Sequence, residues 1–204
     1  HEVTMLPTYL PHFLDEEPAG GEQRIFFGGI NVYLQHKFSL FRKTPAWVDK
    51  AFDSKWLLKK AAARSGMTSS KDLGEITLST FRGEDGPLVK EVNKVVDWFK
   101  KQGTPDVILL STIMLAGIGK ALRRELKVPV LGFLQGEDSF LDSLLPEYRN
   151  EAWNLLAQDV ARLDGCIAPS RYFGKLMAER LKISEDSVRH HPNGITLNGF
   201  SPRR

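Results

Sequence analysis

Two short apolar runs separated by a helical segment constrain the fold of this chain more than any other feature. Residues 107–110 (Val-Ile-Leu-Leu) and residues 128–134 each form a nearly continuous apolar run. Such runs are typical of strands in a parallel sheet, which are buried on both faces. The segment between them fits a helix, so the three pieces form one strand–helix–strand unit with a right-handed crossover. We therefore expect the strand at 107–110 to be covered on both faces.

The same alternation continues toward the C-terminus. Apolar residues recur at helical spacing over 88–99 and again over 153–163, and a third buried strand fits 165–168. Ser170 can cap the helix that follows, and a last short strand fits 188–191. This order of helices and strands predicts an α/β fold class. The predicted architecture is a Rossmann-like, doubly wound parallel sheet with helices on both faces.

The first part of the chain is less regular. Residues 1–6 alternate in polarity and predict a strand, and residues 7–23 predict a loop rich in proline and glycine. Residues 24–35 contain two β-rich runs around a pair of glycines, which fits a tight hairpin or a bulge in one bent strand. Residues 37–66 are basic and aromatic and contain helical stretches, and residues 71–81 fit a further helix. A linker or short helical turn is expected from Ser139 to Pro146.

Composition excludes several classes of protein. The 204 residues carry a net charge of only +3, which gives no case for nucleic acid. The single cysteine, Cys166, fits a reducing cytoplasm and is expected in the core. No apolar run reaches the length of a membrane span. The basic residues of 50–64, interleaved with Trp47 and Trp56, could lie against anionic lipid, although a solvated basic face explains them as well.

Polar residues follow the two strands of the central unit. In open parallel sheets, ligands bind beyond the carboxyl ends of the strands. The candidate substrate-binding or catalytic residues there are Ser111, Thr112, Gln135, Gly136, Glu137 and Asp138. Gly136 would let a ligand approach the backbone, and the two acids could bind ligand hydroxyls. Helix capping explains the two hydroxyl residues equally well, and the acids could instead cap the structure that begins at Ser139.

Three more residues are weaker candidates for substrate binding. Ser170 and Arg171 open a predicted helix, where an anion is favoured, although a plain cap accounts for them too. Arg82 precedes a helix and could help to bind a substrate, with a solvated turn as the alternative. We expect no metal, because His190 and His191 are adjacent on a strand and point to opposite faces.

The order of these pieces resembles the N-terminal, glycosyltransferase-4-like domain of GT-B-type retaining glycosyltransferases (glycosyl transferase group 1). The stretch HEVTML at 1–6 resembles the second strand of that family, PDVILLST the fourth strand and VPVLGFLQGED the fifth. DGCIAPSRYFGKLM resembles a later strand with its serine and helix. VRHHPNGITLNGFSP resembles the tail that leads into a partner domain. The resemblance covers roughly residues 1–6 and 105–202.

The resemblance implies a glycosyltransferase of hexosyltransferase type that moves a sugar from a nucleotide-sugar donor to an acceptor with retention. The acceptor would be a sugar, a lipid or a small molecule, and the donor would be a co-substrate, with no other cofactor. Residues 1–196 would form the Rossmann-like N-terminal domain and residues 197–204 the start of an interdomain linker. Two parts of the family pattern are not found in this sequence. They are the opening strand, which would lie between the strands at 1–6 and 107–110, and the C-terminal domain.

The resemblance also assigns a role to Gln135. Many members of the family have a histidine at this position, which is taken to contact the donor sugar. Gln135 is therefore the candidate catalytic residue, and it can form hydrogen bonds but cannot titrate. Without the donor-binding domain we expect the chain to be inactive. The alternative is a non-catalytic α/β module that binds a nucleotide or a sugar, and a NAD-linked enzyme is disfavoured because no G-x-G-x-x-G follows a strand.

Overall fold

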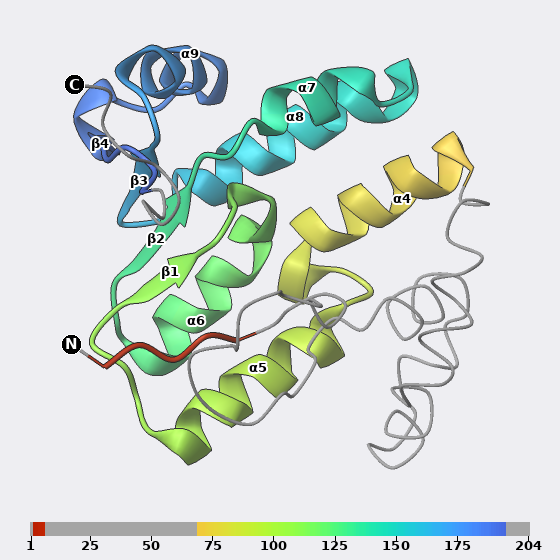
Figure 1. Cartoon of the computed structure of the whole chain (residues 1–204). Helices are drawn as coiled ribbons and strands as arrows, with labels where there is room; N and C mark the ends of the chain where they lie inside the picture. The colour runs from red at the N-terminus through yellow and green to blue at the C-terminus, as the bar shows by residue number, and fades with distance from the viewer. Residues whose placement is uncertain (1, 7–68, 195–204) are drawn as a thin grey trace, which may run out of the picture.

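The computed structural model describes residues 2–6 and 69–194 (Figure 1). Its centre is a four-stranded parallel sheet with the order β1-β2-β3-β4. The strands are β1 (Ile108–Leu110), β2 (Val130–Phe133), β3 (Gly165–Ala168) and β4 (Val188–His190). Leu110, Gly132, Cys166 and Val188 lie side by side across all four strands. This sheet and its connecting helices confirm the predicted Rossmann-like α/β fold.

Helices join and surround the strands. They are α4 (Ser70–Phe81), η3 (Gly83–Asp85), α5 (Val89–Gln102), η4 (Ile113–Ile118), α6 (Gly119–Leu126), α7 (Glu137–Ser143), α8 (Pro146–Val160), α9 (Arg171–Leu181) and η5 (Glu185–Ser187). The helices predicted at 71–81 and 88–99 are confirmed as α4 and α5, and Gly103 ends α5 as expected. The helix predicted between the first two strands is confirmed as η4 followed by α6.

The helices that connect the four described strands lie on one face of the sheet, so the predicted helices on the second face stay a prediction. Three right-handed crossovers that step across a sheet in one direction must all pass over the same face. Contacts agree with this: a Cβ on Gly119 of α6 would meet Val130, and a Cβ on Gly174 of α9 would meet Ala168. On this covered face the residues of β1 to β3, such as Ile108, Val130 and Ala168, are buried.

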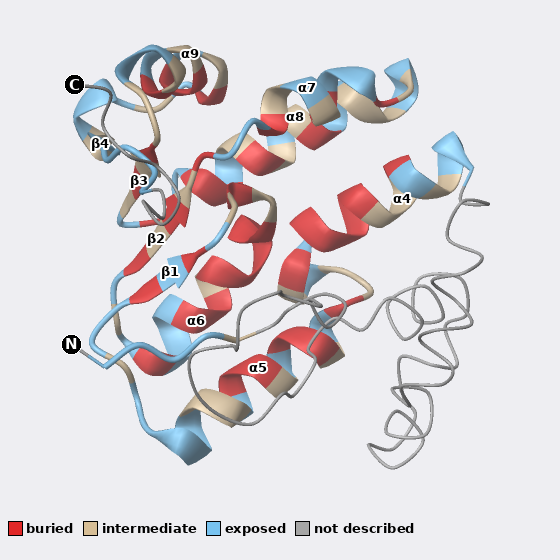
Figure 2. Ribbon diagram, viewed as in Figure 1, coloured by how far each residue is buried: buried red, intermediate tan, exposed pale blue. Residues whose placement is uncertain are grey.

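The prediction that the strand at 107–110 is buried on both faces is wrong. Val107 is 44 % exposed and Leu109 is 51 % exposed. Figure 2 shows part of β1 in pale blue, the colour of exposed residues. The physical reason is that the crossover helices cover only the face of Ile108 and Leu110, and β1 is the outer strand of the described sheet. The loop, hairpin and helices predicted over 7–68 lie outside the described residues.

The strand predicted at the start of the chain is also wrong. Residues 2–6 form no strand, and residues 2–5 are exposed, whereas Leu6 packs against the core. Alternating polarity alone does not make a strand, because a strand also needs a hydrogen-bonded neighbour. Within the described part of the chain, no strand pairs with the outer edge of β1, so the position of an opening strand stays a prediction.

A close backbone contact fixes the start of the first crossover. A Cβ on Gly117 of η4 would collide with the carbonyl oxygen of Phe81, and a Cβ on Gly83 would collide with the carbonyl oxygen of Gly117. Gly83 also has a φ of 48°, which favours glycine. The turn after α4 therefore packs directly on η4. This contact supports the segment that leaves the carboxyl end of β1.

One buried acid couples folding to pH. Asp159, in the last turn of α8, is only 7 % exposed, and its Oδ1 atom accepts a hydrogen bond from Arg162 at 3.2 Å. Its Oδ2 atom has no partner. Burial, only partly offset by the charge of Arg162, raises the pKa of Asp159 to about 6.

We expect this acid to destabilise the fold as the pH rises. Because the pKa of Asp159 is higher in the folded than in the unfolded protein, protonation of this acid stabilises the fold. The contribution is complete below the unfolded pKa near 4 and is lost as the pH rises through about 6. The loss is at most about 3 kcal/mol and smaller after solvent screening. Urea unfolding from pH 4 to pH 7 should therefore show a fall in stability that Asp159→Asn removes.

The variant Asp142→Asn provides the matched control. A hydrogen bond from Arg180 lowers the pKa of Asp142, so this acid contributes stability that is lost as the pH falls. Asp142→Asn should leave the loss between pH 4 and pH 6 in place. An Asp159→Asn profile parallel to that of the wild type would contradict the assignment.

Candidate functional site

The carboxyl ends of β1 and β2 bring the first group of predicted residues together. Ser111 and Thr112 follow β1, and Thr112 has extended backbone angles. The Thr112 hydroxyl accepts a hydrogen bond from the amide of Met114 at 3.2 Å. This contact confirms that Thr112 caps the helical segment after β1. Ser111 is exposed beside it.

Glu137 joins the loops that follow these two strands. Its side chain is buried, with 5 % of the residue exposed, at the start of α7. The Thr112 hydroxyl donates to Oε1 at 2.6 Å, and the Gln135 amide donates to Oε2 at 2.7 Å. A buried carboxylate is stable only when such donors replace water. Glu137 therefore fixes the positions of Thr112 and of the Gln135 backbone.

Gln135 and Gly136 form the exposed surface above this carboxylate. The Gln135 side chain has no hydrogen-bond partner among the described residues. Gly136 has a φ of 94°, and a Cβ there would meet nothing within 4 Å. The glycine is needed for its left-handed backbone rather than for lack of space. It turns the chain from β2 into α7, and its exposed backbone is open to a ligand.

The segment after Gly136 is helical. Of the two alternatives predicted for 139–146, a linker or a short helical turn, the structure shows the second: the short helix α7 begins already at Glu137 and ends at Ser143, and α8 begins at Pro146. Asp138 therefore lies in the first turn of a helix and is half-buried. Asp138 is near enough to Arg180 for its charge to raise the pKa of that guanidinium, after the larger effect of Asp142.

A cluster that the sequence did not reveal holds α7 in place. Both terminal nitrogens of Arg180 in α9 donate to the carboxylate of Asp142 in α7, each at 2.8 Å. The indole nitrogen of Trp153 in α8 donates to Asp142 at 3.0 Å, and the Arg180 guanidinium lies 4.3 Å from the Trp153 ring centroid. Arg180 lowers the pKa of Asp142, against the effect of burial. These contacts hold α7, which begins at Glu137, against α8 and α9.

Cys166 lies in the core, as predicted. It is buried in β3, and burial together with the nearby charge of Glu137 raises its pKa to about 11. A thiol with such a pKa is almost entirely protonated near neutral pH, so Cys166 is unsuited to act as a nucleophile.

The second group of predicted residues lies at the end of β3. The Ser170 hydroxyl accepts a hydrogen bond from the amide of Phe173 at 3.1 Å, which confirms the predicted helix cap. Arg171 is exposed in the first turn of α9. Arg82 instead forms an ion pair with Glu151 of α8 at 2.6 Å. None of the described contacts brings Arg82 to the strand ends.

A comparison with known protein families shows which family the chain belongs to. The family described as Glycosyltransferase Family 4 matches residues 76–198, which is more than half of the chain. The chain belongs to Glycosyltransferase Family 4. The match contains all four strands and both groups of strand-end residues. It supports a GT-B-type N-terminal domain and glycosyl transfer as the general activity. No curated protein matches the chain.

Two features are absent from the described part of this glycosyltransferase domain. Among residues 2–6 and 69–194, the structure shows no cluster of three or more His, Cys, Asp or Glu side chains that could hold a metal ion. In the same part of the chain, no helix combines the length and the apolar character needed to cross a membrane.

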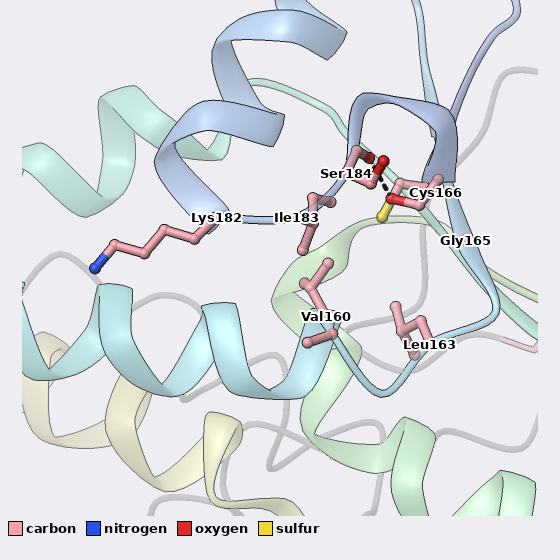
Figure 3. Close-up of a pocket in the computed structure, with 9 residues that line it drawn as sticks. Val160, Leu163, Gly165, Cys166, Lys182, Ile183 and Ser184 are labelled. Carbon is pink, nitrogen blue, oxygen red and sulfur yellow. Dashed lines mark hydrogen bonds between the residues drawn. The ribbon is translucent and has the colours of Figure 1, made fainter.

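A hollow at the opposite edge of the sheet is less suited to a ligand. It has a volume of about 280 Å³ and lies between the end of α8, the start of β3 and the segment after α9 (Figure 3). Val160, Leu163 and Ile183 contribute apolar surface, and the Ser187 hydroxyl already donates to the carbonyl of Ser184 at 2.6 Å. The hollow lies at the amino end of β3, away from the ends where parallel sheets bind ligands.

We expect Thr112→Val to destabilise the protein by about 1–3 kcal/mol, because it leaves a buried carboxylate oxygen without a donor. Urea unfolding measures this change in the free energy of unfolding. Ser111→Ala, at an exposed neighbour, is the control and should change stability by no more than about 0.5 kcal/mol. Equal stability of Thr112→Val and wild type would show that the contact does not hold the strand ends together.

Proposed function

We propose that this chain is the acceptor-binding domain of a glycosyltransferase that transfers a sugar from a nucleotide-sugar to an acceptor with retention. The observation that carries the proposal is the Glycosyltransferase Family 4 match over residues 76–198, which contains the polar ends of β1 and β2. Ligands of open α/β sheets bind at this edge, and the described structure has an ordered polar loop there.

The proposed roles follow from the exposure of each group. The free Gln135 side chain would contact the donor sugar, and the Gly136 backbone would lie against it. Ser111 is exposed and could bind an acceptor hydroxyl. Glu137 and Thr112 bond to each other, so we assign them to positioning the loop rather than to direct substrate contact.

This half of the enzyme would contribute mainly by positioning. Retaining transfer passes through an oxocarbenium-like centre and needs the departing diphosphate to be neutralised. Glutamine can donate and accept hydrogen bonds but cannot act as a general acid or base. In our proposal a second, donor-binding domain supplies most of the charge, and closure of the two domains excludes water. The enzyme would be cytoplasmic, and the basic and aromatic residues of 47–64, which lie outside the described part, would contact the inner membrane face.

The direct test is an assay with labelled nucleotide-sugars and a panel of acceptors. We expect the 204-residue chain alone to give no transfer, and the chain joined to its donor-binding domain to give transfer with retention. Binding of a nucleotide-sugar or sugar without transfer by the longer protein would instead support a non-catalytic binding module.

A substitution tests the role of Gln135. In the active protein, Gln135→Ala should lower kcat about tenfold or more, because it removes a hydrogen-bonding group at the reacting sugar. Gln102→Ala, at the exposed end of α5, removes the same amide far along the chain from the site and should leave kcat unchanged. An unchanged kcat in Gln135→Ala would contradict the proposed role.

A further inference from the structure

A second hollow lies between the start of α9 and β4. It has a volume of about 520 Å³, within the range of about 300–1,000 Å³ that is common for small-molecule sites. Its polar lining residues are Ser170, Arg171, Lys175, Glu185, Arg189 and His190. Ala168 and His190 end their strands, so the hollow reaches the same carboxyl edge of the sheet as Gln135.

The arginines of this hollow differ from all other described arginines. The part of the chain that the structure describes contains eight arginines, and six of them have a carboxylate or carbonyl partner. The pairs are Arg82–Glu151, Arg123–Asp164, Arg124–Glu84, Arg149–Leu144, Arg162–Asp159 and Arg180–Asp142. Arg171 and Arg189 are exposed and have no partner among the described residues. These two guanidinium groups, which have no described partner, line the same hollow.

The charge of the lining favours an anion. Arg171, Lys175 and Arg189 contribute three positive charges, and Glu185 contributes one negative charge. A guanidinium group offers paired N–H donors whose spacing matches the oxygens of a phosphate. Arg171 also lies in the first turn of α9, an eleven-residue helix, and the positive end of the helix dipole adds to the attraction.

We propose that this hollow binds the phosphoryl group of a small-molecule ligand. The inference extends the proposed function and rests on it only for the source of the phosphate. In the transferase, the group would be the phosphate of a phosphorylated acceptor or the diphosphate of a nucleotide, bound beside the edge where the sugar reacts.

Calorimetric titration of the 204-residue chain in 0.15 M KCl tests the proposal. The probes are glucose 6-phosphate, UDP and, as uncharged references, glucose and uridine. We expect glucose 6-phosphate or UDP to bind at least tenfold more tightly than its uncharged reference. A preference for glucose 6-phosphate identifies the phosphate of an acceptor, and a preference for UDP identifies that of a nucleotide.

Substitutions locate the binding. The double variant Arg171→Gln/Arg189→Gln should weaken binding of the preferred probe by about tenfold to a hundredfold, because it removes charge-assisted hydrogen bonds. Lys71→Gln/Lys101→Gln removes the same charge from exposed positions of α4 and α5 and should change binding less than twofold. Arg171→Lys/Arg189→Lys keeps the charge, should bind with intermediate affinity, and shows whether the site tolerates substitution without unfolding.

Several outcomes would overturn the inference. They are the absence of any preference for the phosphorylated probes, an equal loss of affinity in the lysine control, and unchanged affinity in the folded arginine variants. The titration needs neither a donor-binding domain nor turnover. Failure of this inference is therefore distinguishable from failure of the proposed sugar transfer.

Discussion

A single buried carboxylate organises the edge of the sheet on which the functional proposal rests. Glu137 accepts hydrogen bonds from Thr112 after β1 and from the Gln135 amide after β2. Burying a carboxylate in a low-dielectric interior is costly unless donors replace the lost water, and here each oxygen has one. The two loops are therefore held in one arrangement. That arrangement presents the Gln135 side chain and the Gly136 backbone to solvent.

The rest of the structure supports this carboxylate from behind. Glu137 belongs to the seven-residue helix α7, which is too short to be stable by itself. The contacts of Asp142 with Arg180 and Trp153 anchor α7 to α8 and α9. Helix α9 contacts β3 and β4, and α8 contacts η4 and α9. The geometry of the strand ends thus depends on helices that contribute no exposed group to the loop of Gln135.

Much of the fold could be predicted because its determinants are local. The apolar runs gave the strands β1 to β3, and Thr112 and Ser170 were recognisable as caps from residue type and position alone. The exposure of Leu109 could not be predicted, because it depends on the side over which later crossovers pass. The choice of a helix over a linker at 139–146, and its start at Glu137, could not be predicted, because α7 is held by contacts of Asp142 with Arg180 and Trp153, which lie far apart in the sequence. The same holds for Glu137, whose partner Thr112 lies 25 residues away.

The central claim is that the carboxyl edge of the sheet, organised by Glu137, is the edge that binds substrate. A crystal structure of the protein soaked with a nucleotide-sugar or an acceptor sugar tests it most directly. The account predicts ligand density against Gln135 and Gly136, at the ends of β1 and β2. Density in the hollow of Val160 and Ile183, at the amino end of β3, would contradict it.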